Sequence, residues 1–230
     1  MDYEMDCSDI KNIKKELKNF HSMVNHDMRM PLLAILGYTD MFMKLKNNKL
    51  DDEKISAMVS GINRAGKKLL RVVENIITAS GLESGKLKPS RKHVDIRLLL
   101  KEVGDELPSV SREKGLVFSL PAEDGPVVAF VDKEMIKRAV LSLFYFAVGR
   151  SERGTVIDVT ANGSPDGKFT EITIASFPAL LRREDIDGSN DNGIVEIFTA
   201  RTIAEAHGGC LDIGLTEDKK LILTLSLPQA

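Results

Sequence analysis

The stretch from Phe20 to Pro31 (FHSMVNHDMRMP) contains residue types that could do chemistry together. It places His26 beside Asp27 and three residues before Arg29. An imidazole changes charge near neutral pH, and its neutral form is a nucleophile. A neighbouring carboxylate can orient the ring or take its proton, and a guanidinium can attract a phosphoryl group. The segment therefore predicts a nucleophilic His26 assisted by Asp27 and Arg29, although an isolated histidine on a helix is more often an ordinary surface residue.

Two long helices are predicted to carry this segment. Apolar residues recur at steps of three and four, which is helical spacing, at Ile10, Ile13, Leu17, Phe20, Val24, Leu32, Ile35, Leu36 and Met43. Because His26 lies two positions after Val24, it should face solvent. Asp51 or Asp52 should cap the second helix, whose apolar stripe from Ile55 to Ile77 is broader than one hairpin can bury. A second copy would cover it, so we expect a dimeric four-helix bundle.

The pattern changes to mixed α/β after residue 88, where a basic, proline-containing stretch indicates a linker. We therefore expect one domain over 1–88 and another over 89–230, with an α+β fold overall. The second domain should contain helices over 96–114, 133–149 (capped by Asp132) and 193–207, and strands over 116–120, 127–131, 155–161, 169–175, 210–215 and 221–227.

Composition argues against several classes of function. A net charge of −2 and the absence of Trp do not favour nucleic acid as a partner. Without about 18 consecutive apolar residues, no membrane span is expected. Two distant cysteines favour a reducing cytoplasm over a disulfide framework. No pair among His21, His93 and His207 has metal-ligand spacing, so no metal site is expected and these histidines should be structural or exposed.

The His26 segment resembles the H-box of the dimerisation and phosphotransfer domain of bacterial histidine kinases. The matching residues are Phe20, Asn25-His26-Asp27, Met28-Arg29, Pro31-Leu32 and Ile35-Leu36-Gly37-Tyr38, and the exit GLESGKLK (81–88) also fits. The resemblance implies that His26 accepts a phosphoryl group as a phosphoramidate and exchanges it with a receiver-domain aspartate. Relatives that dephosphorylate receivers carry Thr or Asn where this chain has Met30. A thioether is a poor hydrogen-bond partner, so receiver phosphatase activity is not expected.

The second domain resembles the ATPase-like (Bergerat, GHKL-like) catalytic α/β sandwich of the same kinases. The family's Glu-Ala-His-Gly-Gly ending is intact at 205–209. Its nucleotide-binding positions are not: the resemblance assigns them to Ser142, Phe146, Gly149, Ser176, Pro178 and Glu196. A phenyl ring cannot bind Mg²⁺, proline lacks an N–H, and a glutamate would repel phosphates. The resemblance therefore implies a retained fold with a degenerate ATP site.

Two further segments belong to this expectation. In the family's glycine-rich loop only Gly193 remains, and the acidic tract 184–191 is better explained as a solvated loop than as a magnesium site.

The favoured interpretation is that the chain is a homodimeric phosphorelay protein in which His26 exchanges phosphoryl groups with response-regulator receivers. It would need no cofactor of its own, because the receiver would supply Mg²⁺. Receivers should dock around Met23, Met30 and Leu33, and a sensor histidine kinase is a further candidate partner. Two alternatives stay open: a true histidine kinase with an atypical ATP site, and a non-catalytic pseudokinase that sequesters a receiver or kinase.

Overall fold

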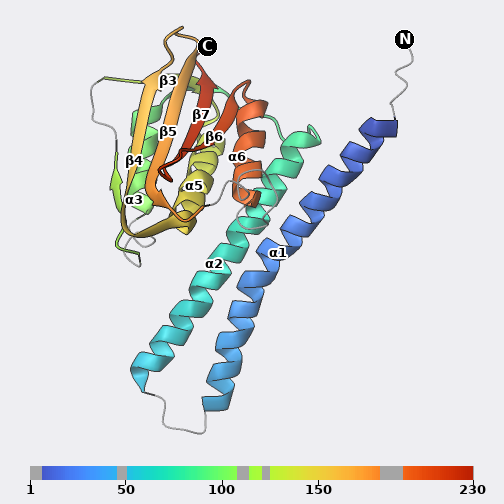
Figure 1. Cartoon of the computed structure of the whole chain (residues 1–230), viewed down its shortest axis with the longest axis vertical. Coiled ribbons are helices and arrows are strands. Elements are labelled where there is room, and N and C mark those ends of the chain that lie inside the picture. Colours follow the sequence, from blue (N-terminus) through green and yellow to red (C-terminus); the bar gives the residue numbers. More distant parts are fainter. Residues whose placement is uncertain (1–6, 46–50, 108–113, 121–124, 182–193, 230) are drawn as a thin grey trace. The chain divides into compact units, whose positions relative to one another are not determined.

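The computed structural model describes residues 7–45, 51–107, 114–120, 125–181 and 194–229, with side chains from Val24 onward except those of Leu45 and Ile194. The chain divides into two compact units, 1–76 and 77–230. Helix α2 (Asp52–Glu83) continues from the first unit into the second (Figure 1). The expected domain boundary at 88–89 stays a prediction.

Helices α1 (Cys7–Leu45) and α2 form an antiparallel hairpin. Asp51 caps α2, since its Oδ1 accepts a hydrogen bond from the Lys54 backbone N–H at 2.8 Å. The two helices approach closely where Tyr38 lies over Gly61: a Cβ atom on Gly61 would be 2.4 Å from Tyr38 Cζ. The predicted pair of long helices is confirmed.

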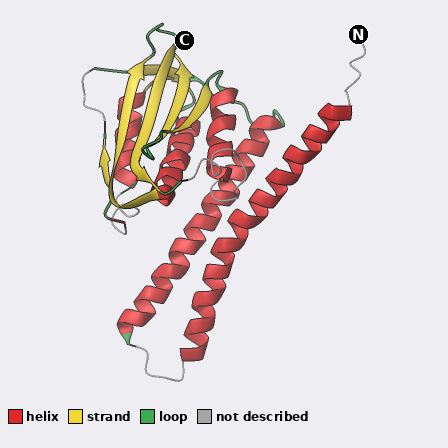
Figure 2. Ribbon diagram, in the orientation of Figure 1, coloured by secondary structure: helices red, strands yellow, loops and turns green. Residues whose placement is uncertain are grey.

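The second unit is built on a five-stranded sheet in the order β2 (Val117–Ser119), β4 (Ser151–Gly163), β5 (Phe169–Ala179), β7 (Leu221–Pro228) and β6 (Cys210–Leu215). The β2–β4 pair is parallel and the others are antiparallel. Helices α3 (Ile96–Glu106), α5 (Lys133–Arg150) and α6 (Ile194–Ala206) cover one face of this sheet, as Figures 1 and 2 show. A separate two-stranded ladder pairs β1 (Lys92–Asp95) with β3 (Val128–Val131).

Alternation along the strands builds the core between this sheet and its helices. Every second residue of the central strands is buried, namely Ile157, Val159 and Ala161 on β4 and Ile172 and Ile174 on β5. Each fully buried aliphatic side chain contributes about 1.5–3 kcal/mol relative to an exposed one. The α+β class, with a helical hairpin followed by a sheet-and-helix domain, is as predicted.

Several elements differ from the expected ranges. The helix predicted over 96–114 ends at Glu106, with Leu107 as its C-cap, and the next residue in the sequence, Pro108, has no N–H with which to continue the helical hydrogen bonds. Strand β1 was not predicted, and β4 and β5 extend beyond their expected limits. Within the described ranges no helix is long and apolar enough to cross a membrane.

Candidate functional site

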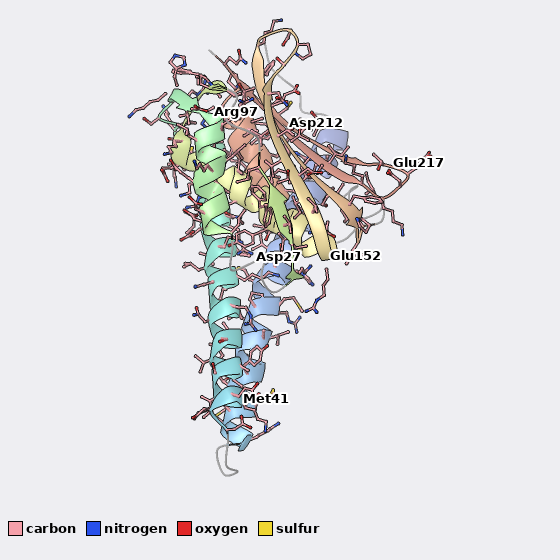
Figure 3. The ribbon with its side chains drawn as sticks, turned by 90° about the vertical axis from the view of Figure 1, so that its left-hand side faces the viewer. Asp27, Met41, Arg97, Glu152, Asp212 and Glu217 are labelled. Atoms are coloured by element: carbon pink, nitrogen blue, oxygen red, sulfur yellow. The ribbon has the colours of Figure 1, made fainter. Side chains whose placement is uncertain are left out.

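His26 lies on α1, and its side chain is 36% exposed. Asp27 is next to it but faces the interior of the hairpin, where its side chain is only 7% exposed (Figure 3 labels it). The closest approach is 3.5 Å, between His26 Nδ1 and Asp27 Oδ1. Nδ1 is buried, so the exposed part of the ring is the side that carries Nε2. The structure thus presents Nε2 outward and aims a buried carboxylate at the opposite ring nitrogen.

Both partners in this pair have unused hydrogen-bonding capacity. Among the described residues, His26 Nδ1 and Asp27 Oδ2 are buried atoms without a hydrogen-bond partner. A distance of 3.5 Å is long for a hydrogen bond, but a small rotation of either side chain would close it. A neutral ring with its proton on Nδ1 would point that proton at Asp27 and leave the Nε2 lone pair free for attack.

Arg29 is exposed and lies one turn along α1 from His26. Three residues turn a helix by about 300°, so the Arg29 side chain is displaced by only about 60° around the axis from His26. Within the described part of the chain its guanidinium makes no hydrogen bond or ion pair. It is placed to meet an anion that approaches Nε2, which is what the sequence suggested for it.

Exposed apolar side chains surround His26 on the side of α1 that faces away from α2. Pro31 is buried in the hairpin and marks the side of α1 that faces α2. Measured around the helix axis from Pro31, the angles are roughly 200–260° for Met30, Leu33 and His26. We call these three residues the His26 face. Met23, also expected in a docking surface, has no described side chain.

A second exposed apolar surface lies on another side of the hairpin. It comprises Leu32, Leu36 and Met43 of α1 and Val59 and Leu70 of α2, and we call it the apolar face. Most of these residues lie roughly 100–140° around their helices from the buried seam. Because the two helices are antiparallel, the same sense of rotation places both sets on one side of the hairpin. An exposed apolar surface of this kind on one side of a hairpin marks a candidate interaction site.

Asn75 is a buried polar residue that the sequence analysis did not single out. Tyr38 lies opposite Gly61, so residues whose numbers sum to about 99 share a level in this antiparallel hairpin. Asn75 therefore lies near the level of Val24, within one turn of His26. The available signal was a polar residue three positions after Val72, inside an otherwise apolar stripe.

The expected metal-ligand position in the second unit is filled by a hydrophobic residue. Phe146 of α5 is only 4% exposed, and the Arg150 guanidinium lies 3.7 Å from the centre of its ring. Arg150 also donates a hydrogen bond to the Phe146 carbonyl at 3.4 Å. Ser142, one turn earlier on α5, is buried as well. The stack thus covers the residue that the resemblance assigns to the metal-ligand position with a cation, and the phenyl ring offers no oxygen ligand.

The end of β5, where the resemblance assigns nucleotide-binding positions to Ser176 and Pro178, donates backbone hydrogen bonds to protein carbonyls. Ser176 is buried, with its Oγ lacking a partner among the described residues, and Pro178 follows two positions later. The next amide, that of Ala179, donates to the Lys219 carbonyl at 2.9 Å, and the amide of Leu180 donates to the Arg150 carbonyl. Backbone N–H groups that a glycine-rich turn would offer to a nucleotide are therefore already used.

Glu196 lies in the first turn of α6 and is buried. A carboxylate at a helix N-terminus occupies a position that would otherwise favour a phosphate. Gly193 and the acidic tract 184–191 lie outside the described residues. Within the described residues no group of three or more His, Cys, Asp or Glu side chains could hold a metal ion.

The other histidines differ in setting. His93 is exposed, with its ring centre 5.1 Å from that of Phe130, and His207 is fully buried. The side chain of His21 is not among those described.

Comparison with known proteins agrees with this geometry. Residues 16–85 match the His Kinase A (phospho-acceptor) domain. The hybrid signal transduction histidine kinase D of Dictyostelium discoideum is 28% identical over 134 residues, which cover 58% of this chain and 8% of that protein. An uncharacterised sensor-like histidine kinase of Rhizobium meliloti is 22% identical over 223 residues, covering 91% of this chain and 42% of its own length. The chain thus spans less than half the length of these relatives.

Solved structures show the same fold. Histidine kinase AdeS of Acinetobacter baumannii superposes with a TM-score of 0.64 at 17% identity, covering 89% of this chain and 98% of that one. Histidine kinase ThkA, solved in complex with the response regulator protein TrrA, gives a TM-score of 0.68 at 17% identity over 96% of this chain and 64% of that one. The chain therefore contains a His Kinase A domain and has the fold of a histidine kinase core.

Proposed function

We propose that this chain is a homodimeric histidine phosphotransfer protein of a two-component phosphorelay, without an ATP-dependent kinase activity of its own. His26 accepts a phosphoryl group from the aspartyl phosphate of one receiver domain and passes it to the aspartate of another. The observation that carries this proposal is the contrast between two sites. The His26 side chain is partly exposed beside a buried carboxylate, whereas Phe146, under the Arg150 guanidinium, occupies the position that the resemblance assigns to the metal ligand.

The transfer follows from the geometry around the ring. The Nε2 lone pair attacks phosphorus while the bond from phosphorus to the aspartyl oxygen breaks, and the receiver carboxylate leaves with the electron pair. The imidazole becomes positively charged as the phosphoramidate forms. Asp27 stabilises this charge and takes the Nδ1 proton across the present 3.5 Å gap. Return of the proton to Nδ1 makes the ring a good leaving group for the reverse transfer.

Arg29 supports the same step electrostatically, because its exposed guanidinium can pair with phosphoryl oxygens near Nε2. The receiver contributes Mg²⁺ and its acidic pocket, and docking supplies alignment. The complex of ThkA with TrrA supports a receiver as the partner. Met30, at the edge of the His26 face, offers no strong hydrogen bond to an attacking water, so we propose transfer without receiver phosphatase activity.

The two exposed surfaces of the hairpin receive different partners. We assign the apolar face to a second copy of the chain, which gives a four-helix bundle with two outward His26 rings. We assign the His26 face to the receiver, because Met30 and Leu33 flank the reacting ring.

A true histidine kinase is the second candidate, since the curated relatives are named as kinases and share this fold. It requires that ATP bind despite the Phe146–Arg150 stack. A pseudokinase that only sequesters a partner is the third, and it predicts that His26→Ala leaves the biological effect unchanged.

Calorimetric titration of the full chain with a Mg²⁺-bound, non-hydrolysable ATP analogue separates the first two candidates. A histidine kinase with an intact ATP site serves as the positive control in the same buffer. We expect no saturable heat from this chain at nucleotide concentrations that saturate the control. Saturable binding would overturn the proposed loss of the ATP site and make autophosphorylation of His26 the leading hypothesis.

A further inference from the structure

His207 is fully buried after the end of α6, and both of its ring nitrogens bond to backbone atoms. Nδ1 lies 2.7 Å from the Ile203 carbonyl oxygen, and Nε2 accepts a hydrogen bond from the Asp132 N–H at 3.1 Å. A carbonyl can only accept and an amide N–H can only donate. The ring is therefore neutral, with its proton on Nδ1. A second proton on Nε2 would point directly at the Asp132 N–H.

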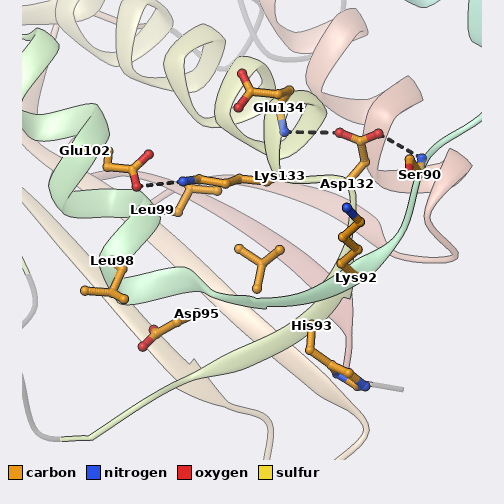
Figure 4. A pocket seen from close by; sticks show the side chains of 11 residues that line it. Ser90, Lys92, His93, Asp95, Leu98, Leu99, Glu102, Asp132, Lys133 and Glu134 are labelled. Atoms are coloured by element: carbon orange, nitrogen blue, oxygen red, sulfur yellow. Dashed lines mark hydrogen bonds and ion pairs between the residues drawn. The ribbon is translucent and has the colours of Figure 1, made fainter.

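Asp132 joins the buried ring to the segment that leaves the helical hairpin. Its Oδ1 accepts from the N–H groups of Glu134 and Met135 and so caps α5. Its Oδ2 accepts from the Ser90 N–H at 2.8 Å. Figure 4 shows the bonds from Asp132 to Ser90 and Glu134. Any movement of Asp132 away from His207 thus disturbs the start of α5 and the bond to Ser90 together.

Hydrogen bonds, more than packing, hold residues 89–92, which we call the exit segment. Ser90, Arg91 and Lys92 are all exposed. Beside this segment a pocket of about 570 Å³ separates it and β1 from α3 and the start of α5 (Figure 4). Three interactions hold the exit segment: the Ser90 bond to Asp132, the Arg91 bond to the Ala206 carbonyl at 2.7 Å and the β1–β3 ladder. Loss of the first is therefore not compensated by buried apolar surface.

We propose that His207 is a proton-operated latch: its neutral ring fastens Asp132, and through it the exit segment, to the sheet domain, and protonation of the ring releases them. The device is independent of phosphotransfer at His26. It lies on the covalent connection between the hairpin and the sheet domain, so its release would loosen that connection.

The charges around the ring set the direction of the response. Burial is the main cause that lowers the pKa of His207 below its ordinary value of 6.5. The Ile203 bond and the Asp132 carboxylate raise this pKa, and the Arg91 guanidinium lowers it further. Because the folded pKa is depressed, the latch contributes its full stability above about pH 6.5. That contribution is lost as the pH falls toward the folded pKa, since the open state takes up the proton first.

The test uses the full, unmodified chain. Nitrogen-15 NMR of labelled histidine should report His207 as the neutral Nδ1–H tautomer at pH 7.5. Amide hydrogen exchange, corrected for the chemical exchange rate at each pH, should show Ser90 losing protection by about tenfold per pH unit below pH 6.5. A protonated ring, the opposite tautomer, or Ser90 protection that is constant down to pH 5.5 would overturn the proposal.

Two variants isolate the responsible ring. His207→Gln cannot take up a proton, so exchange at Ser90 should become insensitive to pH between 7.5 and 5.5. His93→Gln replaces an exposed histidine on the neighbouring strand and should keep the wild-type response. A wild-type pH dependence in His207→Gln, or its loss in His93→Gln, would contradict the latch. If His207→Gln fails to fold, the measurements on the wild-type chain still decide.

Discussion

At the residue scale, the proposed chemistry depends on the two ring nitrogens of His26. Nε2 must be accessible to the phosphoryl group, and Nδ1 must lie beside the buried Asp27 carboxylate. Adjacent helix positions point about 100° apart, which is why His26 can face solvent while Asp27 faces the hairpin. A buried carboxylate is less well hydrated than a surface one, so its attraction for a developing imidazolium is stronger. Asp27 should therefore affect the rate of transfer more than any other carboxylate of α1.

Replacing Asp27 with Asn tests this role because the shape is kept and the charge is removed. General-base assistance is typically worth at least 10²-fold, so we expect the initial rate of phosphoryl transfer to His26 to fall by roughly 10²-fold. Asp40→Asn changes an exposed carboxylate on the same helix and should leave the rate unchanged. The measurement is a rapid-quench time course with a phosphorylated receiver. Equal rates in Asp27→Asn and wild type would remove Asp27 from the mechanism.

At the scale of elements, the hairpin separates a dimer surface from a receiver surface by rotation around α1. Leu36 belongs to the apolar face and Leu33 to the His26 face, and both side chains are exposed. Three residues along the helix turn the side chain by about 300°, so the two leucines point about 60° apart. The assignment of partners therefore predicts different effects for substitutions at these two leucines: a change at Leu36 should affect dimerisation, and a change at Leu33 should affect receiver binding.

Introducing a charge at each leucine distinguishes these surfaces. Leu36→Glu should weaken self-association at least tenfold, because a carboxylate would be buried between two hairpins. Leu33→Glu should stay dimeric yet lose transfer from the receiver. Sedimentation equilibrium measures the first effect and the labelling assay the second. Self-association lost in Leu33→Glu and retained in Leu36→Glu would reverse the assignment.

The close contact between Tyr38 of α1 and Gly61 of α2 leads to a second prediction for the hairpin. Gly61→Ala would place a methyl group 2.4 Å from Tyr38 Cζ, so the ring must move. Overpacking of this kind costs about 1–3 kcal/mol, which offsets or exceeds the gain of about 1 kcal/mol in helix propensity. Gly37→Ala meets no atom within 4 Å and should stabilise the hairpin by up to about 1 kcal/mol. Urea unfolding should place the midpoint of Gly61→Ala below that of Gly37→Ala; the reverse order would show that Tyr38 moves without cost.

At the scale of the whole molecule, the sequence predicted the order of elements better than their limits. Hydrophobic periodicity indicated the two long helices, and the cap at Asp132 is confirmed where α5 begins. The early end of α3 coincides with Pro108, whose missing N–H is a helix-stop signal that the sequence analysis passed over in favour of the apolar pattern. Strand β1 was missed because its four residues, KHVD, include only one apolar side chain, whereas the equally short β3, VAFV, is apolar throughout.

The candidate site, like the fold, could be predicted only in part from the sequence. The partial exposure of His26 follows from its place on one helix, so the sequence alone could indicate it. The burial of Asp27 and Asn75 depends on the facing helix, and the burial of Phe146 depends on how α5 packs into its domain. No spacing rule within one segment reveals such burial. Loss of the ATP site was suggested by the residue types. Phe146 and Arg150 are four residues apart on α5, which is the spacing that lets a guanidinium stack on a ring, but the sequence analysis did not use this signal.

The most direct test of the central claim measures the acid-labile phosphate that accumulates on His26. The full chain is incubated with labelled, phosphorylated receivers in one series and with labelled Mg²⁺–ATP in another, with His26→Ala as the control in both. We predict stoichiometric label from at least one receiver, none from ATP and none in His26→Ala. Label from ATP on His26, with none from any receiver, would contradict the account and identify the chain as a histidine kinase.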